Sequence, residues 1–533
     1  MANGRRSVMS HSFNRVPEVK IPRSSFNRSH GHKTTFDSGY LVPVYVDEVL
    51  PGDTFNLSAS FFARMTTPLF PLMDNLFLDS FFFFVPNRLV DANFKKMMGE
   101  QDNPADSISF TVPQITSPSG GWTANSLGDY MGLPTAGNAT GGVLTGNTVN
   151  SCAYFTRAYN KIWNDWFRDE NLQNSVTVDT GAGPDSASNY VLLRRGKRFD
   201  YFTSCLPNPQ KGSAAVTIPL GTKAPVTADS ANSGFLDYYN STLAGYKHIE
   251  TDGTYAIVTT TAGTAATALY ADLSSATAAT VNQLRQSFQI QKLLERDARG
   301  GTRYTEIVRS HFGVISPDAR LQRAELLGQS SQPIVTHTVP QTSATGVSGG
   351  STAMGSLAAF ATSAGRSGFV KSFTEHGVIL GLVSVRADLS YQQGLNRMFS
   401  RSTRYDFYWP SFAHLGEQSV LNQEIYCDGS GAGGNDGGVF GYQERHAEYR
   451  YKPSLITGQF RSTYATPLDG WHLAQKFASL PTLNSTFIQD TPPLSRVLAV
   501  SATGSQFYFD SYIKLVCARP MPVYGIPGMI DRF

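Results

Sequence analysis

The sequence predicts a mainly β fold with long, turn-rich connections and a few helices. Of its 533 residues 16% are charged and 12% are aromatic, and glycine and proline together account for 48 + 28 = 76. That mixture is typical of a folded, turn-rich β protein and argues against a disordered chain. From residue 40, short β-branched or aromatic runs alternate with the breaker PGD, as in successive strands. The length fits two to four ordinary domains, or one domain with large insertions.

The first 36 residues form a basic segment. It carries seven cations against Glu18, a net charge of 7 − 1 = +6 that leaves −3 for the remainder of a chain whose total is +3. The seven are Arg5, Arg6, Arg15, Lys20, Arg23, Arg28 and Lys33. Because large aliphatic side chains are few, we expect a flexible or extended arm whose cations suit a phosphate backbone. An ordinary solvated terminus is the alternative. No apolar run follows the basic residues, so no secretory signal is predicted.

The stretch NLFLDSFFFFVPNR reads as one strand with two dry faces. Phe77, Phe81 and Phe83 would face one side and Phe82 and Phe84 the other, which is not the alternation of a sheet with one wet face. Burying each ring is worth about 1.5–3 kcal/mol. A membrane span is excluded because charges and prolines interrupt the apolar run before the roughly 18 residues that a span requires. We therefore expect one face in a sandwich core and the other beneath long loops or a neighbouring molecule.

Two amphipathic helices and three low-complexity segments interrupt the strands. In CAYFTRAYNKIWNDWFRDENLQ (152–173) and VNQLRQSFQIQKLLERDARGG (281–301), large apolar residues recur at steps of three and four. Segments 212–281 and 342–368 are rich in Ala, Thr, Ser and Gly, and a third, CDGSGAGGNDGG, begins at Cys427. Because such compositions build little core, we expect surface insertions between the strands of a sandwich or barrel.

No motif assembles into a catalytic or metal site. GVSGG around Ser348 matches G-x-S-x-G, but low-complexity sequence stands where a nucleophile elbow needs a strand and a helix. GSGAGG at 429–434 matches G-x-G-x-x-G, but no helix follows that could hold a pyrophosphate. Asp428 and Asp436 lack EF-hand spacing, His472 fits a packed histidine, and the four cysteines form no CxxC pair. We therefore expect free thiols, no enzymatic activity, no cofactor and no metal.

Aromatic and arginine residues are interleaved in two later stretches, RYDFYWPSF from Arg404 and GYQERHAEYRYKP from Gly441. These residue types anchor protein interfaces. The alternative is that both stretches are internal strands whose arginines lie at the edges. The pattern favours a protein that works by associating, and it leaves open the choice between an interface and buried strands.

Longer stretches of the chain point to a family. In one order and nearly end to end, the sequence contains FFVPNRLV, MGEQ, AYNKIWNDWFRDENLQ, LRRGKRFDYFTSCLPNPQKG, LLERDARGGTRYTEIVRSHFGV, SPDARLQR, SFTEHGVILGLVSVRADLSYQQGLNRMFSR, TRYDFYWPSFAHLGEQ, GYQERHAEYRYKPS, DGWHLAQ and YGIPG. By these stretches it resembles the major capsid protein of gokushoviruses, small single-stranded DNA phages of the Microviridae. It departs from that family near VDANFKK, a stretch that is commonly rich in tryptophan in the family and has Phe94 here.

The resemblance implies an eight-stranded antiparallel viral jelly roll with long loop insertions and a few helices, formed as a single domain by residues 37–533. It also implies self-assembly into a T=1 icosahedral shell that encloses circular single-stranded DNA. Residues 212–281 would form an outer protrusion at the three-fold axes and meet a host surface receptor. The arm of residues 1–36 would lie inside, with the DNA or a small basic DNA-binding protein.

By the same resemblance the chain would be part of the virion and would assemble in the bacterial host cytoplasm, with a minor pilot protein as a further partner and no membrane insertion. One alternative is a β-sandwich protein that binds a receptor or a carbohydrate and forms no shell. A secreted protein of that kind would need a signal peptide and acidic residues clustered around aromatic platforms. The sequence shows neither feature.

Overall fold

The computed structural model describes most of the chain. The described residues are 22–137, 141–213, 216, 226–227, 236–240, 245–251, 256–259, 270–271, 281–315, 322–342, 346–347, 350–351, 355–499 and 504–525. The chain divides into two compact units, of which the larger combines residues 1–209 with 314–533 and the smaller is 210–313.

The larger unit is built around one antiparallel sheet, which has nine strands in the described residues. They are β1 (Ser24–Asn27), β2 (His30–Phe36), β3 (Val42–Val49), β4 (Thr54–Met65), β5 (Leu76–Pro86), β14 (Glu325–Pro340), β17 (Leu357–Ser372), β18 (Gly377–Ala387) and β23 (Phe507–Arg519). β1 and β2 pair with different parts of β23, so together they occupy one strand position. The strands expected from residue 40 onward are confirmed as β3 and β4, with a turn at the PGD breaker.

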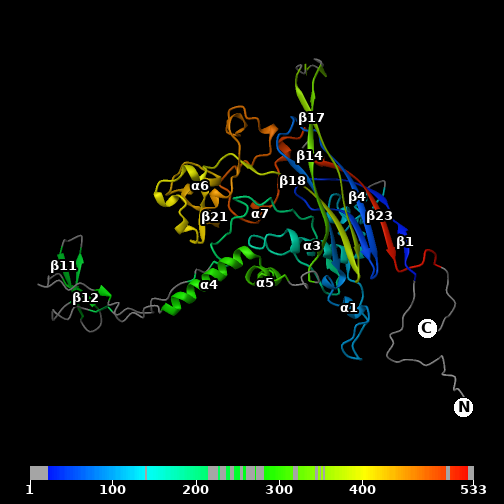
Figure 1. Ribbon diagram of the computed structural model, residues 1–533, viewed down its shortest axis with the longest axis horizontal. Helices are drawn as coiled ribbons and strands as arrows, with labels where there is room; N and C mark the ends of the chain where they lie inside the picture. The colour runs from blue at the N-terminus through cyan, green and yellow to red at the C-terminus, as the bar shows by residue number, and fades with distance from the viewer. Residues whose placement is uncertain are drawn as a thin grey trace, which may run out of the picture. The chain divides into compact units, whose positions relative to one another are not determined.

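The strand order identifies the architecture. Across the sheet the order is β1/β2, β23, β4, β17, β14, β5, β18 and β3. Counted along the chain, these positions read 1-8-3-6 followed by 5-4-7-2, the order of two Greek keys wound into a jelly roll. β14 joins the halves, because its first part pairs with β5 and its last part with β17. The curled antiparallel sheet in Figure 1 confirms the expected eight-stranded jelly roll.

The two halves of the jelly roll differ in how many of their faces are buried. In β4 and β23, buried and exposed residues alternate, as in a sheet with one wet face. In β5 and β18, nearly every residue is buried. The inner faces of both halves share one core, which includes Phe55, Phe61, Phe82, Phe369 and Phe509. The expected two dry faces of the phenylalanine-rich strand therefore correspond to the inner core and to a second core on the opposite face.

The second core covers the outer face of β3, β5 and β18. It brings Phe81 and Phe83 together with Tyr159 and Trp163. These two aromatic residues lie in α3 (Tyr154–Ile162) and in the π-helical turn η2 (Trp163–Phe167) that continues it. The Tyr159 hydroxyl donates a hydrogen bond to the Leu41 carbonyl at 2.8 Å, which ties the helix to the sheet. The helix expected over 152–173 is thus confirmed, and its aromatic face packs on the strands.

One of the three expected surface insertions is partly a core strand. β17 begins at Leu357, so nearly half of segment 342–368 lies within the main sheet and not on a surface loop. The physical reason is close packing: a Cβ at Gly368 would clash with the Leu57 carbonyl, and one at Gly365 with the Gln332 side chain. Small residues are needed there, and composition alone does not distinguish that need from a loop.

A third core forms in the connection between β18 and β23. Its regular elements are β19 (Ser390–Tyr391), β20 (Glu417–Leu421), α6 (Asn422–Ile425), β21 (Val439–Glu444), β22 (Ser454–Leu455) and α7 (Ser485–Ile488). The core packs Phe440 and Phe487 of this connection against Tyr201 and Phe202. Remaining short elements of the larger unit are α1 (Phe94–Met97), β6 (Gln114–Thr116), α2 (Leu127–Tyr130), β7 (Asn150–Cys152), β8 (Asp185–Ser186), β15 (Gly346–Val347) and β16 (Gly350–Ser351).

The smaller unit contains two helices, α4 (Val281–Gly300) and α5 (Tyr304–Phe312), in its described residues. α4 confirms the helix expected over 281–301. Short strands lie within the predicted insertion 212–281, namely β9 (Val226–Thr227), β10 (Leu236–Asn240), β11 (Gly245–Thr251), β12 (Ala256–Thr259) and β13 (Tyr270–Ala271). Most of that insertion lies outside the described residues.

Two further features bear on the expectations from the sequence. Among the described residues, no helix has both the length and the apolar character that crossing a membrane would demand. The four cysteines are all free thiols, as expected.

Candidate functional site

Half-exposed aromatic side chains gather on the connection between β18 and β23. They are Tyr405, Phe407, Tyr408, Trp409, Tyr449 and Tyr451, and together they are termed the aromatic surface. They come from the two stretches in which the sequence interleaves aromatic residues with arginines. The first stretch forms the 3-10 turns η6 (Arg404–Asp406) and η7 (Pro410–Phe412), so the internal-strand alternative is wrong for it. The second runs from β21 into the 3-10 turn η9 (Ala447–Tyr449).

Local hydrogen bonds fix the turn that presents the first stretch. Thr403 and Asp406 form a capping box at the start of η6, with the Asp406 carboxylate accepting from the Thr403 backbone amide at 2.7 Å. These bonds lower the pKa of Asp406, so the cap is charged near neutral pH. The Trp409 indole donates to the Arg404 carbonyl at 2.9 Å, which closes the turn and orients the ring. The exposed rings are therefore held in place by short-range bonds.

An arginine connects the two stretches. The Arg401 guanidinium lies 4.5 Å from the centre of the Tyr449 ring and 5.1 Å from that of Phe407, within the range of cation–π contacts. It also lies 3.6 Å from the Glu448 carboxylate. Tyr408 packs against Tyr449 with ring centres 6.5 Å apart. Phe407, Tyr408 and Tyr449 are thus joined in one cluster.

His446 lies buried beneath this cluster. Its ring meets the Tyr408 ring edge-on, with centres 5.4 Å apart and an angle of 89°. Burial, together with nearby Arg445, lowers the pKa of His446, so the ring is neutral at pH 7. It lines a cavity of about 150 Å³ with Arg397 and Glu448. None of the six rings of the aromatic surface lines this space.

The chemistry of this site is that of an interface anchor. Large rings that are rigid and half exposed, with arginines between them, are the residues that carry the binding energy of protein interfaces. No group of His, Cys, Asp and Glu that could hold a metal ion occurs among the described residues. His472, considered above as a packed histidine, is buried and contacts the Phe460 carbonyl through Nε2 at 2.7 Å. Ser348 lies outside the described residues.

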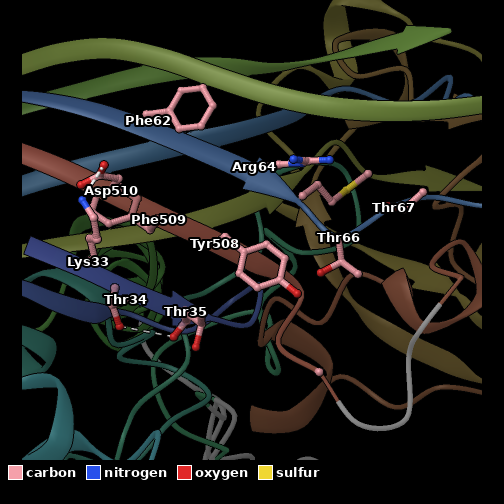
Figure 2. Close-up of a pocket in the computed structure, with 12 residues that line it drawn as sticks. Lys33, Thr34, Thr35, Phe62, Arg64, Thr66, Thr67, Tyr508, Phe509 and Asp510 are labelled. Carbon is pink, nitrogen blue, oxygen red and sulfur yellow. Dashed lines mark hydrogen bonds and ion pairs between the residues drawn. The ribbon is translucent and has the colours of Figure 1, made fainter. Parts of the chain in front are cut away.

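The structure places only some of the predicted DNA-contacting cations. Four of the seven lie outside the described residues, namely Arg5, Arg6, Arg15 and Lys20. Arg23 is exposed and donates to the Thr54 hydroxyl at 2.8 Å. Arg28 is paired with Asp47 at 2.6 Å and Lys33 with Asp510 at 2.9 Å, the latter at the outer face of the sheet (Figure 2). Residues 24–27 and 30–36 of the predicted arm form β1 and β2.

The five predicted core phenylalanines lie in β5. Phe82 and Phe84 point into the inner core and Phe81 and Phe83 into the second core. Phe77 is partly buried, with the Arg198 guanidinium 4.3 Å from the centre of its ring. Sequence reasoning did not identify the partners of the single charge in this strand, Asp79, which pairs with Arg195 and Arg386.

Comparison with known proteins gives consistent matches over almost the whole chain. A family model described as "Capsid protein (F protein)" matches residues 14–529. Capsid protein VP1 of Bdellovibrio phage phiMH2K is 46% identical over 548 residues, which cover 98% of each chain. Capsid protein VP1 of Chlamydia phage 1 is 44% identical over 608 residues, 99% of this chain and 100% of the relative. Capsid protein VP1 of Spiroplasma virus 4 is 36% identical over 553 residues, 97% of each chain.

Proposed function

The chain belongs to the phage capsid protein (F protein) family, as its resemblance to gokushovirus capsid proteins predicted, and on this premise we propose that it builds a T=1 icosahedral shell around circular single-stranded DNA. Its work is structural and not enzymatic. The observation that carries the proposal is the eight-stranded jelly roll, combined with an exposed aromatic surface on the connection between β18 and β23. Closed symmetry lets each copy make several contacts at once, which turns modest contacts into a stable particle.

The aromatic surface is the contact between neighbouring copies in this proposal. Six half-exposed rings on locally braced turns would lose little conformational entropy on docking. Arginine and aromatic residues are enriched at the centres of interfaces, where truncation costs 2 kcal/mol or more. The buried His446 and the ion pair of Arg401 with Glu448 support the rings from below.

The test is assembly of variants of this surface. Trp409→Ser and Tyr408→Ser each remove an exposed ring and leave the buried cores untouched. We expect each to reduce the yield of particles in sedimentation and negative-stain electron microscopy, while circular dichroism of the unassembled chain stays the same. Tyr304→Ser, in the smaller unit, is the matched control, since Tyr304 is also strongly exposed. Normal particle yields from both surface variants would rule this surface out as a contact between copies.

The remaining parts of the chain take complementary roles. The basic arm would lie on the inside, with the packaged DNA or a small basic DNA-binding protein, because its net charge of +6 suits phosphates. Segment 212–281 would face outward as a three-fold protrusion that meets a host surface receptor, because it has few core-forming residues. A minor pilot protein would join the particle, and assembly would take place in the bacterial host cytoplasm.

A further inference from the structure

One broad face of the main sheet is left uncovered by the described part of the chain. It is the outer face of β2, β4, β17 and β23, where alternate residues along each strand are exposed. The opposite half of the jelly roll has its outer face covered by α3 and the second core. The contrast is large, because Phe62, Tyr508 and Tyr512 on the open face are 48%, 50% and 57% exposed. Bare aromatic rings in this number mark a binding surface.

The strand register arranges these rings in a row. Phe62 lies directly opposite Asp510, so Tyr508 and Tyr512 are its two diagonal neighbours on β23. Diagonal neighbours on one sheet face are about 7–8 Å apart. That spacing is about twice the 3.4 Å rise per nucleotide of one strand in a duplex, and it suits a strand whose bases are unstacked. Phe62, Arg64 and Tyr508 line a hollow of about 810 Å³ on this face. Figure 2 shows these three side chains on β4 and β23.

The charges on the same face are mostly positive. The outward-facing charged side chains of β2, β4, β17 and β23 are Lys33, Arg64, Arg366, Lys514 and Asp510, a net charge of 4 − 1 = +3. Lys33 neutralises Asp510 at 2.9 Å. In the described part of the chain, Arg64, Arg366 and Lys514 form no ion pair. Three unpaired cations therefore flank the row of rings, with Arg64 opposite Tyr508 and Lys514 next to Tyr512 on the same face of β23.

We propose that this face binds single-stranded nucleic acid, with bases stacked on Tyr508, Phe62 and Tyr512 and phosphates held by the unpaired cations. The inference rests on the proposed function and names the surface that the packaged strand meets. Stacking rings within a positive groove are how proteins hold single strands without sequence preference. β1, which pairs with β23 at the edge of this sheet, belongs to the basic segment of residues 1–36. A second copy of the chain fits less well, because two copies of this face would bring like charges together, and the unpaired cations there would require acidic partners.

The test measures binding of a labelled oligothymidylate of about 20 nucleotides to the full chain over a range of salt concentrations. Tyr508→Ser and Tyr512→Ser should each weaken binding about tenfold, and the control Tyr304→Ser should not. Arg64→Gln should lower the slope of log affinity against log salt by about 0.7, while the tyrosine variants leave the slope unchanged. Unchanged affinity in both tyrosine variants would overturn the proposal.

Crosslinking gives a readout that does not depend on variants that fold. An oligonucleotide containing 5-iododeoxyuridine, bound to the unaltered chain and irradiated, should attach to Tyr508, Phe62 or Tyr512. Attachment confined to other residues would refute the proposed site. Loss of particles in the tyrosine variants with unaltered oligonucleotide binding would also refute it, and would instead identify the face as a contact between copies. Absence of particles from the unaltered chain would count against the shell and would leave the binding result to decide this inference.

Discussion

Phe82→Ala should destabilise the chain far more than Phe62→Ala, although both replace a phenylalanine in the same jelly roll. Phe82 is 1% exposed and packs against Phe369, with ring centres 5.5 Å apart. Truncating a buried phenylalanine to alanine costs about 3–5 kcal/mol, a large fraction of a domain's net stability of about 5–15 kcal/mol. Phe62 lies on the wet face, where substitutions usually change stability by no more than about 0.5 kcal/mol. The expected difference is therefore at least about 2.5 kcal/mol.

Phe83→Ala tests the second core in the same way. Phe83 is also 1% exposed, and its ring centre lies 5.6 Å from that of Trp166 and 5.8 Å from that of Phe167. We expect a loss of similar size, about 3–5 kcal/mol, since both faces of β5 are dry. Phe82→Asp would bury a charge without a partner and should prevent folding.

The assay is urea unfolding of the unassembled chain, followed by intrinsic fluorescence and far-UV circular dichroism. Phe82→Ala and Phe83→Ala should lower the midpoint, and Phe62→Ala should leave it where it is. If all three variants unfold at the midpoint of the unaltered chain, the account of two dry faces on β5 is wrong.

Three further predictions concern other parts of the chain. Asp79→Asn should cost about 3–5 kcal/mol, because Asp79 is buried 2.5 Å from Arg195 and 2.8 Å from Arg386, and the change removes the charged carboxylate that pairs with both cations. Burial alone would raise the pKa of Asp79, but Arg195 and Arg386 hold it below its ordinary 3.8. The stabilisation by these ion pairs is therefore complete above about pH 4 and is lost as the pH falls further. An acid titration in which the Asp79→Asn variant loses stability in step with the unaltered chain would contradict this. Removing residues 1–21, which keeps β1 and β2, should lower nuclease-protected DNA in particles more than it lowers thermal stability, and equal DNA retention at matched salt would count against an interior arm. Replacing 212–281 with a short linker should leave a soluble, folded chain with altered host attachment, and loss of soluble protein would disprove a surface role.

Sequence patterns predicted the strand with two buried faces and the two long amphipathic helices. The phenylalanine-rich strand lacks the alternation of a sheet with one wet face, and β5 is buried on both sides. The apolar steps of three and four residues predicted α3 and α4. In each case neighbours along the chain carry the signal, so a single stretch is enough to read it.

Features that depend on distant neighbours could not be read in the same way. The glycines of β17 resemble those of a flexible loop in composition. Gly365 and Gly368 are instead small because neighbouring strands pack closely against them, so the prediction of a surface insertion was wrong for this part of the segment. The row of Tyr508, Phe62 and Tyr512 exists only through the pairing of β4 with β23, whose sequences lie at opposite ends of the chain. The alternation in FYFDSYIKLV predicts a strand with one wet face, but not which residues lie beside it.

The aromatic surface could be predicted from the sequence only in part. Its residue types were visible in RYDFYWPSF, and interleaved rings and arginines indicated an interface. Their exposure was not visible, because 3-10 turns closed by Trp409 and Asp406 replace the strand that the aromatic content would favour. Local side-chain bonds to the backbone thus override strand propensity at this site.

The mass of the assembled product tests the central claim most directly. The chain has a mass of 58.1 kDa, so a shell with one copy at each of the sixty icosahedral positions would have a protein mass of about 3.5 MDa. Native mass spectrometry or sedimentation of the purified product, with electron microscopy of the same sample, should find uniform particles of that protein mass. A product that remains a monomer under all assembly conditions, or that forms open aggregates of indefinite mass, would contradict a closed shell.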